Sequence, residues 1–278
     1  MELQRIAAFC EGQLGGNPAG VMLLDTPLSS KEMARIAADV GYSETVFATP
    51  LSLDRKSWKV RYFSPESEVP FCGHATIALG AALGEREGEG TYQLVLNDAH
   101  ISVETEQTEQ GFSARLQSPN THSQALQKDA LLNVLNLFSL SISDLDPRLA
   151  PSLIHGGANH IAITLKSRQR LKSMSYNLDE GRSLMRELGI VTVMLVFIES
   201  EQIFNVRNAF ASGGVFEDPA TGAAAAAFAG YLRDINWPHG GSFTIKQGQD
   251  MGQPSIIQVD LTNQQGSPVF VSGLARTI

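Results

Sequence analysis

The feature that most constrains the fold is an internal repeat. The segments EVPFCGHA (68–75) and EDPATGAA (217–224) begin a little more than half a chain apart. They share a glutamate, a proline, a glycine and an alanine in register, and each follows a strand-like segment and opens an alanine-rich one. Repetition of strand, turn and helix at this spacing indicates duplication of a whole domain. We therefore expect two similar lobes in the 278 residues.

The alanine-rich segments are unusual helices. HATIALGAAL (74–83) and ATGAAAAAFAGYL (220–232) have strong helix propensity and almost no polar face. A helix that is apolar all round is normally buried, and one made of Ala and Gly suits a space with close walls. A slim helix through a curled sheet fits both segments, although two ordinary core helices also would.

The turns before these helices point to a ligand. The first amides of a helix have no intrahelical acceptor, and the helix dipole leaves partial positive charge there. Gly73 and Gly222 let the backbone approach a ligand without an intervening Cβ. Two such N-termini facing each other predict a site for a small carboxylate.

Composition excludes several classes of partner. The net charge is −8 and the basic residues are scattered, which argues against nucleic acid. The longest apolar run, GIVTVMLVFI (189–198), is too short to cross a bilayer and is typical of a buried strand. The N-terminal residues show no signal-peptide pattern, and the two cysteines give no disulfide framework. We expect a soluble, cytoplasmic protein without a membrane partner.

Local patterns predict mixed α and β elements. Residues 29–41 form a helix with a capping box from Ser29 and Glu32 and a stop at Gly41. A second helix is expected at 129–138, and the pattern lacks the regular alternation of a doubly wound sheet. Strands are expected at 44–48, 57–63, 91–97, 100–105, 159–166, 191–198, 202–210, 242–248, 255–262 and 268–274.

Cys72 is open to three interpretations. The helix N-terminus and His74 would activate it as a nucleophile, but a free cysteine is more often an inert buried thiol. Cys72 and His74 as metal ligands need further partners. His155 and His160 are available, yet the spacings match no strong zinc pattern, so a metal site is disfavoured.

The acidic residues have structural interpretations too. Glu44 lies between a helix stop and an apolar strand, where spacing alone favours a surface carboxylate over a general base. Asp218 and Thr221 are candidate caps of the second alanine-rich helix. Arg61 and Arg207, in the strands before the two motifs, are expected to form ion pairs with the glutamates that open the motifs, Glu68 and Glu217.

Five motifs together resemble the phenazine-biosynthesis isomerase-like family, which shares the diaminopimelate epimerase fold. They are GGNPAGVMLL (15–24), GYSETVFA (41–48), RYFSPESEVPFCGHATIALG (61–80), EDPATGAAAAAFAGYL (217–232) and KQGQDMGQPS (246–255). The resemblance implies an α+β fold of two pseudo-symmetric lobes, each a curled, mostly antiparallel, barrel-like sheet around a central helix. It also implies an active site in the cleft between them, no cofactor and a homodimer.

The resemblance assigns roles to residues. Glu44 matches the general acid/base, and His74 and Asp218 match residues that contact polar groups of the substrate. Asn17 lines the same site. Cys72, Gly73, Thr221 and Gly222 lie at the paired helix N-termini as substrate-binding residues.

Two departures narrow the chemistry. Diaminopimelate epimerases carry a cysteine before the glycine in both lobes, whereas this chain has Cys72 and Thr221. A threonine hydroxyl is too weak an acid and base to replace a thiol, which disfavours two-thiol racemisation. Ala223 stands where the phenazine enzymes tend to carry a serine, so their substrate is not implied.

We expect residues 1–117, completed by the strand at 268–278, to form the N-terminal lobe and residues 118–267 to form the C-terminal lobe. The leading hypothesis is a cofactor-independent, metal-free isomerase that moves a proton between carbons of a small carboxylate or amino-acid-like substrate through Glu44. One alternative is a racemase or epimerase that uses Glu44 with Cys72. The other is a non-catalytic carboxylate-binding protein on the same scaffold.

Overall fold

The structure is a computed structural model that describes residues 2–97 and 99–278. The chain divides into two compact units, one running to Gln117 and completed by Ser272–Ile278, the other spanning Ser118–Val271. The sequence-based division placed this last boundary after residue 267, whereas the second unit continues to Val271.

The first unit is built mainly of strands. Its strands are β1 (Gln4–Ala8), β2 (Asn17–Leu23), β3 (Thr45–Pro50), β4 (Ser57–Phe63), β5 (Glu68–Val69), β6 (Gly90–Val95), β7 (His100–Thr108), β8 (Gly111–Gln117) and β17 (Phe270–Thr277). Its helices are α1 (Ser30–Val40) and α2 (Gly73–Glu87).

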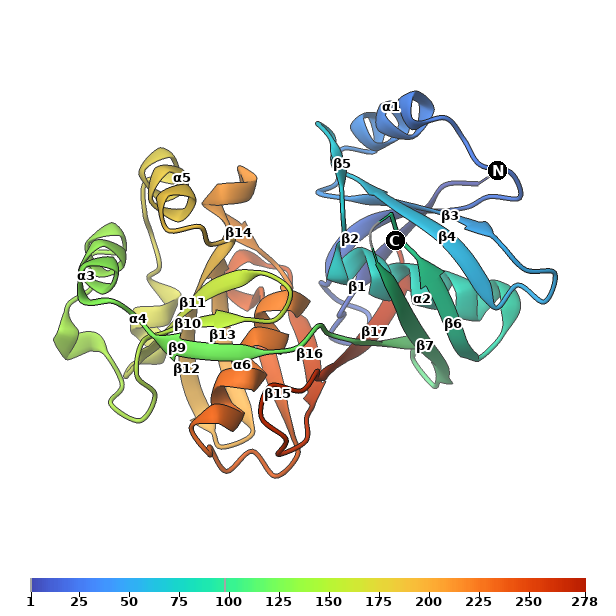
Figure 1. Cartoon of the computed structure of the whole chain (residues 1–278). Helices are drawn as coiled ribbons and strands as arrows, with labels where there is room; N and C mark the ends of the chain where they lie inside the picture. Colours follow the sequence, from blue (N-terminus) through green and yellow to red (C-terminus); the bar gives the residue numbers. More distant parts are fainter. Residues whose placement is uncertain (1, 98) are drawn as a thin grey trace. The chain divides into compact units, whose positions relative to one another are not determined.

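These strands close into a barrel (Figure 1). Successive pairs run β1–β2, β2–β3, β3–β4, β4–β6, β6–β7 and β7–β8, with β2–β3 and β4–β6 parallel and the others antiparallel. The C-terminal strand β17 pairs with both β8 and β1 and so closes the ring. Closure leaves no free sheet edge, which is the usual benefit of a barrel.

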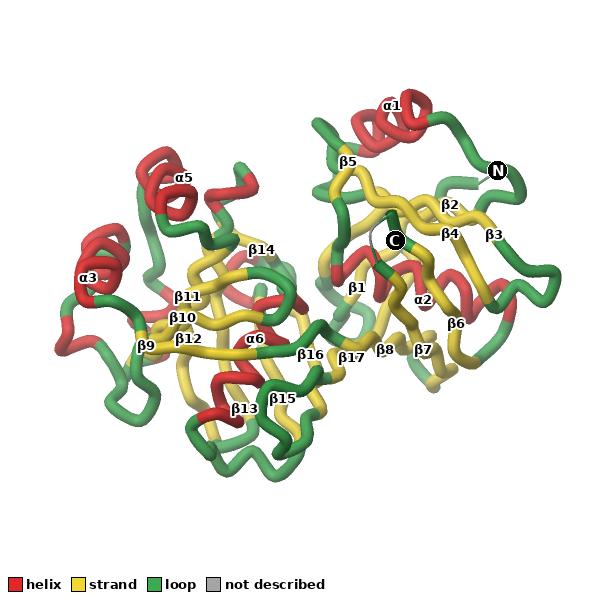
Figure 2. The backbone as a smooth tube through the Cα atoms, viewed as in Figure 1, coloured by secondary structure: helices red, strands yellow, loops and turns green. Residues whose placement is uncertain are grey.

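Helix α2 occupies the inside of this barrel, with strands around it in Figure 2. It contacts β1, β2, β3, β7 and β8, and every residue from His74 to Gly84 is buried. Its small side chains fit because the walls are close: a Cβ on Gly80 would lie 2.7 Å from Ala114 Cβ and 2.8 Å from Val103 Cγ2. The expectation of a slim helix threaded through a curled sheet is confirmed.

The second unit adds more helices to a similar sheet. Its strands are β9 (His122–Ala125), β10 (Ser152–His155), β11 (Asn159–Leu165), β12 (Thr192–Ser200), β13 (Ile203–Ala209), β14 (Glu217–Asp218), β15 (Ser242–Gln247) and β16 (Ser255–Asp260). Its helices are α3 (Lys128–Leu137), α4 (Arg168–Lys172), α5 (Leu178–Glu187) and α6 (Gly222–Asp234), with short 3₁₀ turns at 142–144, 211–213 and 249–251.

The two units share one pairing order. In the second unit β10–β11 are antiparallel, β11–β12 parallel, β12–β13 antiparallel, β13–β15 parallel and β15–β16 antiparallel, as from β1 to β7. Helix α6 contacts β9, β10 and β11 at one side of the sheet and β16 at the other, so the sheet curls around it. The α+β architecture of two pseudo-symmetric lobes around central helices is confirmed.

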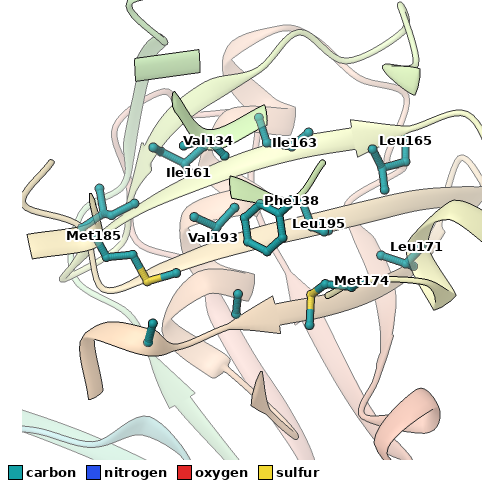
Figure 3. Packing of buried hydrophobic residues seen from close by; sticks show 13 residues of the cluster. Val134, Phe138, Ile161, Ile163, Leu165, Leu171, Met174, Met185, Val193 and Leu195 are labelled. Atoms are coloured by element: carbon teal, nitrogen blue, oxygen red, sulfur yellow. The ribbon is translucent and has the colours of Figure 1, made fainter. Parts of the chain in front are cut away.

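A second apolar layer explains the long hydrophobic run in β12. Thirteen buried residues lie between the outer face of β11–β12 and helices α3, α4 and α5, among them Ile161, Val193, Leu195 and Met185 (Figure 3). Because α6 covers the other face, Thr192–Val196 are all buried and cannot show the alternation of a one-sided strand.

Several local expectations are confirmed. Helix α1 begins after the capping box of Ser29 and Glu32 and ends at Gly41, whose φ is 71°. The helix expected at 129–138 and each of the predicted strands are present, whereas the short helices α4 and α5 were not anticipated. Within the described residues, no helix combines the length and the apolar character needed to cross a membrane.

We expect Gly80→Ala to destabilise the protein. The added methyl would overlap Ala114 and Val103, and overpacking of a core costs about 1–3 kcal/mol. This loss outweighs the roughly 1 kcal/mol that alanine gains over glycine in a helix. Urea unfolding followed by the fluorescence of Trp58, a buried residue of β4, measures the difference.

The matched control is Glu85→Ala, an exposed position of the same helix. It should change the free energy of unfolding by no more than about 0.5 kcal/mol. If Gly80→Ala raised the stability instead, the close fit of α2 in the barrel would be wrong.

Candidate active site

The topology of the first unit gathers polar residues at one end of the barrel. Strands β2 and β3 are parallel, and Asn17 and Glu44 stand at their N-terminal ends. Strand β4 runs antiparallel to β3 and leads through β5 to the start of α2 at Gly73, so the helix begins at that same end. A ligand bound at this end of the barrel would therefore contact Asn17, Glu44 and the first turn of α2.

Three reactive side chains form a compact cluster there. Glu44 Oε2 lies 3.5 Å from His74 Nε2, and Cys72 Sγ lies 3.3 Å from His74 Nδ1. Ser43 Oγ is 3.4 Å from His74 Nε2. The imidazole therefore stands between the thiol on one side and the carboxylate and hydroxyl on the other. We call Glu44, Cys72 and His74 the EHC cluster.

The side chains of the EHC cluster are largely buried but still reach solvent. The side chains of Glu44 and His74 are 17% and 8% exposed. The interpretation of Glu44 as a free surface carboxylate, which spacing alone favoured, is therefore wrong. A partly buried carboxylate next to an imidazole can exchange a proton with a ligand while most of the solvent is excluded.

A buried hydrogen-bond chain fixes the start of α2. Thr76 Oγ1 donates to the Cys72 carbonyl at 2.7 Å, and Tyr62 Oη lies 2.7 Å from Thr76 Oγ1. Burial raises the pKa of the Tyr62 phenol, which keeps this group neutral. The first intrahelical bond runs from Thr76 N to Cys72 O. The amides of the preceding turn are thus directed at the barrel end, as in helix N-termini that bind anions.

Asn17 is held at the same end by a tight turn. It is 2% exposed and pairs with Ala8 across β1–β2. Gly16 before it has φ 86°, and a Cβ there would lie 2.7 Å from Cys10 Sγ and 2.8 Å from Ala8 O. Only glycine fits so close to Cys10 and Ala8, and this tight turn fixes the position of Asn17 at the start of β2.

The second unit carries a different polar group at the start of α6. Thr221 Oγ1 donates to Asp218 Oδ2 at 2.6 Å. Gln247 Nε2 donates to Asp218 O at 2.7 Å and contacts Thr221 Oγ1 at 3.0 Å, while Thr221 N donates to Gln247 Oε1 at 3.3 Å. Asp218 is 9% exposed and Gln247 is 1% exposed. The three residues form one network that orients the carboxylate and the first turn of Gly222 onward.

This network corrects one expectation and adds a residue. Thr221 is the N-cap position of α6 but makes no side-chain cap bond, and Asp218 lies in β14 before the helix, so neither is a side-chain cap of the expected kind. Gln247 was not singled out, although it lies in the motif KQGQDMGQPS. Gly248 behind it has φ 77°, and a Cβ there would meet Pro219 O at 2.8 Å, which explains the glycine in that motif.

The pseudo-symmetry shows which groups only one unit carries. Phe47 pairs with Arg61, and Leu195 pairs with Arg207 in the same register. Glu44 lies three residues before Phe47, and Thr192 lies three residues before Leu195, so Thr192 is the structural equivalent of Glu44. The helix starts align Ala223 with His74 and Thr221 with Cys72. Among the described residues, this carboxylate–imidazole pair is therefore present in the first unit and has no equivalent in the second.

Thr192 has a buried partner instead. His160 Nδ1 lies 2.7 Å from Thr192 Oγ1, the ring is fully buried, and its Nε2 has no hydrogen-bond partner among residues 2–97 and 99–278. Burial lowers the pKa of His160 to about 3, with a smaller contribution from His155. A histidine of this kind stays neutral and makes a poor acid/base at physiological pH.

An ion pair connects the turn before each central helix to the preceding strand. In the first unit Arg61 Nε donates to Glu68 Oε1 at 2.7 Å, with side chains 21% and 29% exposed. In the second Arg207 Nε donates to Glu217 Oε1 at 2.9 Å, with side chains 9% and 3% exposed. A second bond joins the Arg207 guanidinium to Glu217, and Arg207 also donates to the Lys172 carbonyl. Both predicted pairs are confirmed, one near the surface and one buried.

Comparison with known proteins identifies the family. The model of the phenazine biosynthesis-like proteins matches residues 6–278. The chain belongs to this family. It is similar to the protein named uncharacterized isomerase YddE of Escherichia coli K12, with 28% identity over 99% of this chain and 95% of the relative. A relative from Deinococcus radiodurans, also named an uncharacterized isomerase, is 31% identical over 92% of this chain and 85% of its own length.

A solved structure confirms the fold. A phenazine biosynthesis protein of the PhzF family from Bacillus anthracis superposes with a TM-score of 0.86 at 22% identity, covering 100% of this chain and 98% of the other. The family and the names of its relatives place this chain among isomerases, so it is an enzyme of that class.

The two ion pairs predict unequal costs of mutation. Glu217→Gln removes the charge that faces a buried guanidinium, and breaking a buried pair costs about 3–5 kcal/mol. Glu68→Gln disrupts the exposed counterpart, whose loss should cost no more than about 1 kcal/mol. Urea unfolding of the two variants beside wild type measures both, and equal losses would contradict the difference in burial.

His160 should make stability depend on pH. Below its ordinary pKa of 6.5 the unfolded chain protonates this imidazole, whereas the folded chain holds it neutral down to about pH 3. Its contribution is present above pH 6.5 and is lost as the pH falls toward 3, with a slope of up to about 1.4 kcal/mol per pH unit.

The variant His160→Gln should therefore flatten the pH dependence of the free energy of unfolding between pH 6.5 and 4, whatever its stability at neutral pH. His100→Gln, at an exposed position, serves as the control. Identical slopes in wild type and His160→Gln would show that this imidazole is not held neutral.

Proposed function

We propose that this protein is an isomerase that moves a proton between two carbons of a small carboxylate or amino-acid-like substrate, with Glu44 as the acid/base. The observation that carries the proposal is the EHC cluster: a partly buried carboxylate 3.5 Å from an imidazole, at the barrel end where α2 begins. Family membership supports the reaction class, and the residue roles are our assignment.

Glu44 suits a proton shuttle because it can take and return the same proton. His74 donates or accepts hydrogen bonds through Nε2 and thereby orients the carboxylate and a polar group of the substrate. Proton transfer between two carbons is redox-neutral, so the reaction needs no oxidant or reductant. The step needs only that the substrate presents an acidified C–H to Glu44.

The helix N-termini acidify that C–H by binding negative charge. A carboxylate or developing enolate oxygen at the first turn of α2 would meet outward-pointing amides near Gly73 and the positive end of the helix dipole. Such an interaction contributes about 0.3–2 kcal/mol per helix, according to burial. We assign substrate binding to Thr221 and Gly222 at α6 as well, and we assign Asp218 the role of acceptor for a hydrogen-bond donor of the substrate.

The geometry argues against the racemase alternative. A two-base mechanism places the substrate carbon between the bases, each within about 3–3.5 Å of it. The Glu44 carboxylate oxygen, the Cys72 sulfur and a His74 nitrogen all lie within 4.8 Å of one another. This leaves too little room for a carbon between Glu44 and Cys72, so we assign the proton transfer to Glu44 alone.

We expect Glu44→Gln to abolish turnover and to retain substrate binding. The amide keeps the size of the side chain but cannot accept the proton, which should cost at least about 10²–10⁴-fold in rate. The measurement is deuterium uptake by mass spectrometry after incubation of wild type and variant in D₂O with a metabolite extract rich in amino and cyclic carboxylic acids.

Glu66→Gln, an exposed glutamate of the same unit, is the matched control and should label the same metabolite as wild type. A metabolite labelled by wild type and by Glu66→Gln but not by Glu44→Gln would identify the substrate. Equal labelling by all three proteins would refute Glu44 as the acid/base. Ligand-dependent thermal stabilisation with no labelling would favour a binding protein.

A further inference from the structure

We propose that the EHC cluster is also a binding site for Zn²⁺ and that the bound ion inhibits the enzyme. Its three residues offer a carboxylate oxygen, a thiolate sulfur and an imidazole nitrogen, the donors that zinc takes in proteins. The binding claim stands on this geometry alone, and only the inhibition rests on the function proposed for Glu44.

The donor atoms are almost in place for one ion. In a tetrahedral zinc site, bonds of about 2.0–2.3 Å set neighbouring ligand atoms roughly 3.3–3.6 Å apart. His74 Nε2 lies 3.5 Å from Glu44 Oε2 and 4.0 Å from Cys72 Sγ. The three donor atoms lie within 4.8 Å of one another. Cys72 Sγ lies closer to Nδ1, at 3.3 Å, so the imidazole ring must turn before one of its nitrogens faces both Glu44 and Cys72.

The surroundings permit an ion to enter and favour zinc. Glu44 is 17% exposed on its side chain, which gives an ion access from solvent, and an ion with three protein ligands can take water as the fourth. A set of thiolate, imidazole and carboxylate prefers zinc to magnesium or calcium, which seek oxygen ligands.

The sequence alone did not predict this site because the third ligand, Glu44, is distant in sequence from Cys72 and His74. Cys72 and His74 alone match no zinc pattern, and the two histidines considered as partners, His155 and His160, belong to the other unit. The barrel supplies Glu44 from the start of β3, beside the helix that carries the other two ligands.

Inhibition follows from the use of the same atoms. A Glu44 carboxylate that coordinates a metal cannot accept a proton from carbon, and a coordinated His74 nitrogen cannot orient the substrate. Zinc and substrate should therefore exclude one another, so that zinc raises the apparent KM of wild type.

The test is equilibrium competition for Zn²⁺ against a chromophoric chelator, performed on the full chain under reducing conditions. Wild type should bind one equivalent. Cys72→Ser, His74→Gln and Glu44→Gln should each bind at least about 100-fold more weakly, since even loss of an outer-sphere partner costs 10–100-fold. The control is Cys10→Ser, which removes the other cysteine; burial raises the pKa of the Cys10 thiol, so its loss should not change zinc affinity.

A second readout uses Co²⁺ as a spectroscopic substitute. Wild type and Cys10→Ser should show the thiolate-to-metal charge-transfer band of a bound cysteine, and Cys72→Ser should not. Absence of saturable one-equivalent binding would overturn the proposal. So would zinc binding that survives Cys72→Ser and His74→Gln, for example at the stacked pair His122 and His155.

These outcomes separate the two proposals. Zinc binding lost in the cluster variants, in a protein that labels no metabolite in D₂O, would uphold the metal site and refute the isomerase assignment. Glu44-dependent labelling that zinc does not reduce would uphold the isomerase assignment and refute inhibition by zinc, and the chelator competition would still decide whether zinc binds.

Discussion

The rest of the structure depends on the narrow space inside a closed barrel. The walls of the first unit's sheet approach α2 so closely that a Cβ at Gly80 or Gly84 would collide with neighbouring side chains. The buried part of this helix, from His74 to Gly84, has no polar face, so inside the barrel its polar side chains lie in the N-terminal turn. Closure also brings the starts of β2 and β3 to that turn. The position of the candidate site is therefore a consequence of how the barrel is filled.

Duplication supplied two such turns, and they have diverged. The first carries the carboxylate–imidazole pair and a near-surface ion pair; the second carries a hydroxyl–amide–carboxylate network and a buried ion pair. The place of Glu44 is taken by Thr192, which contacts a buried, neutral His160. The first unit thus carries the carboxylate–imidazole pair to which we assign proton transfer, and the second carries the hydroxyl, amide and carboxylate groups to which we assign substrate binding.

The compactness of the EHC cluster has two chemical consequences. Because Glu44 and Cys72 approach the same imidazole, little room is left for a substrate carbon between them, which supports our assignment of a single acid/base. The same proximity of oxygen, nitrogen and sulfur donors creates a coordination set. In our two proposals Glu44 therefore has two roles, as the acid/base and as a ligand of Zn²⁺.

The sequence by itself determined much of the architecture. The repeat at Glu68 and Glu217 indicated two lobes, the Ala/Gly helices indicated close walls, and the arginines before each motif indicated the ion pairs. These features can be predicted from the sequence because each depends on neighbours along the chain or on a pattern within one element. Only the tertiary structure decided the rest. It made Glu44 a partner of His74, engaged Thr221 with Gln247 instead of the helix end, and buried one ion pair more deeply than the other. Those outcomes depend on which strand ends meet at a barrel rim and on which helices cover a sheet, and residues distant in sequence set both.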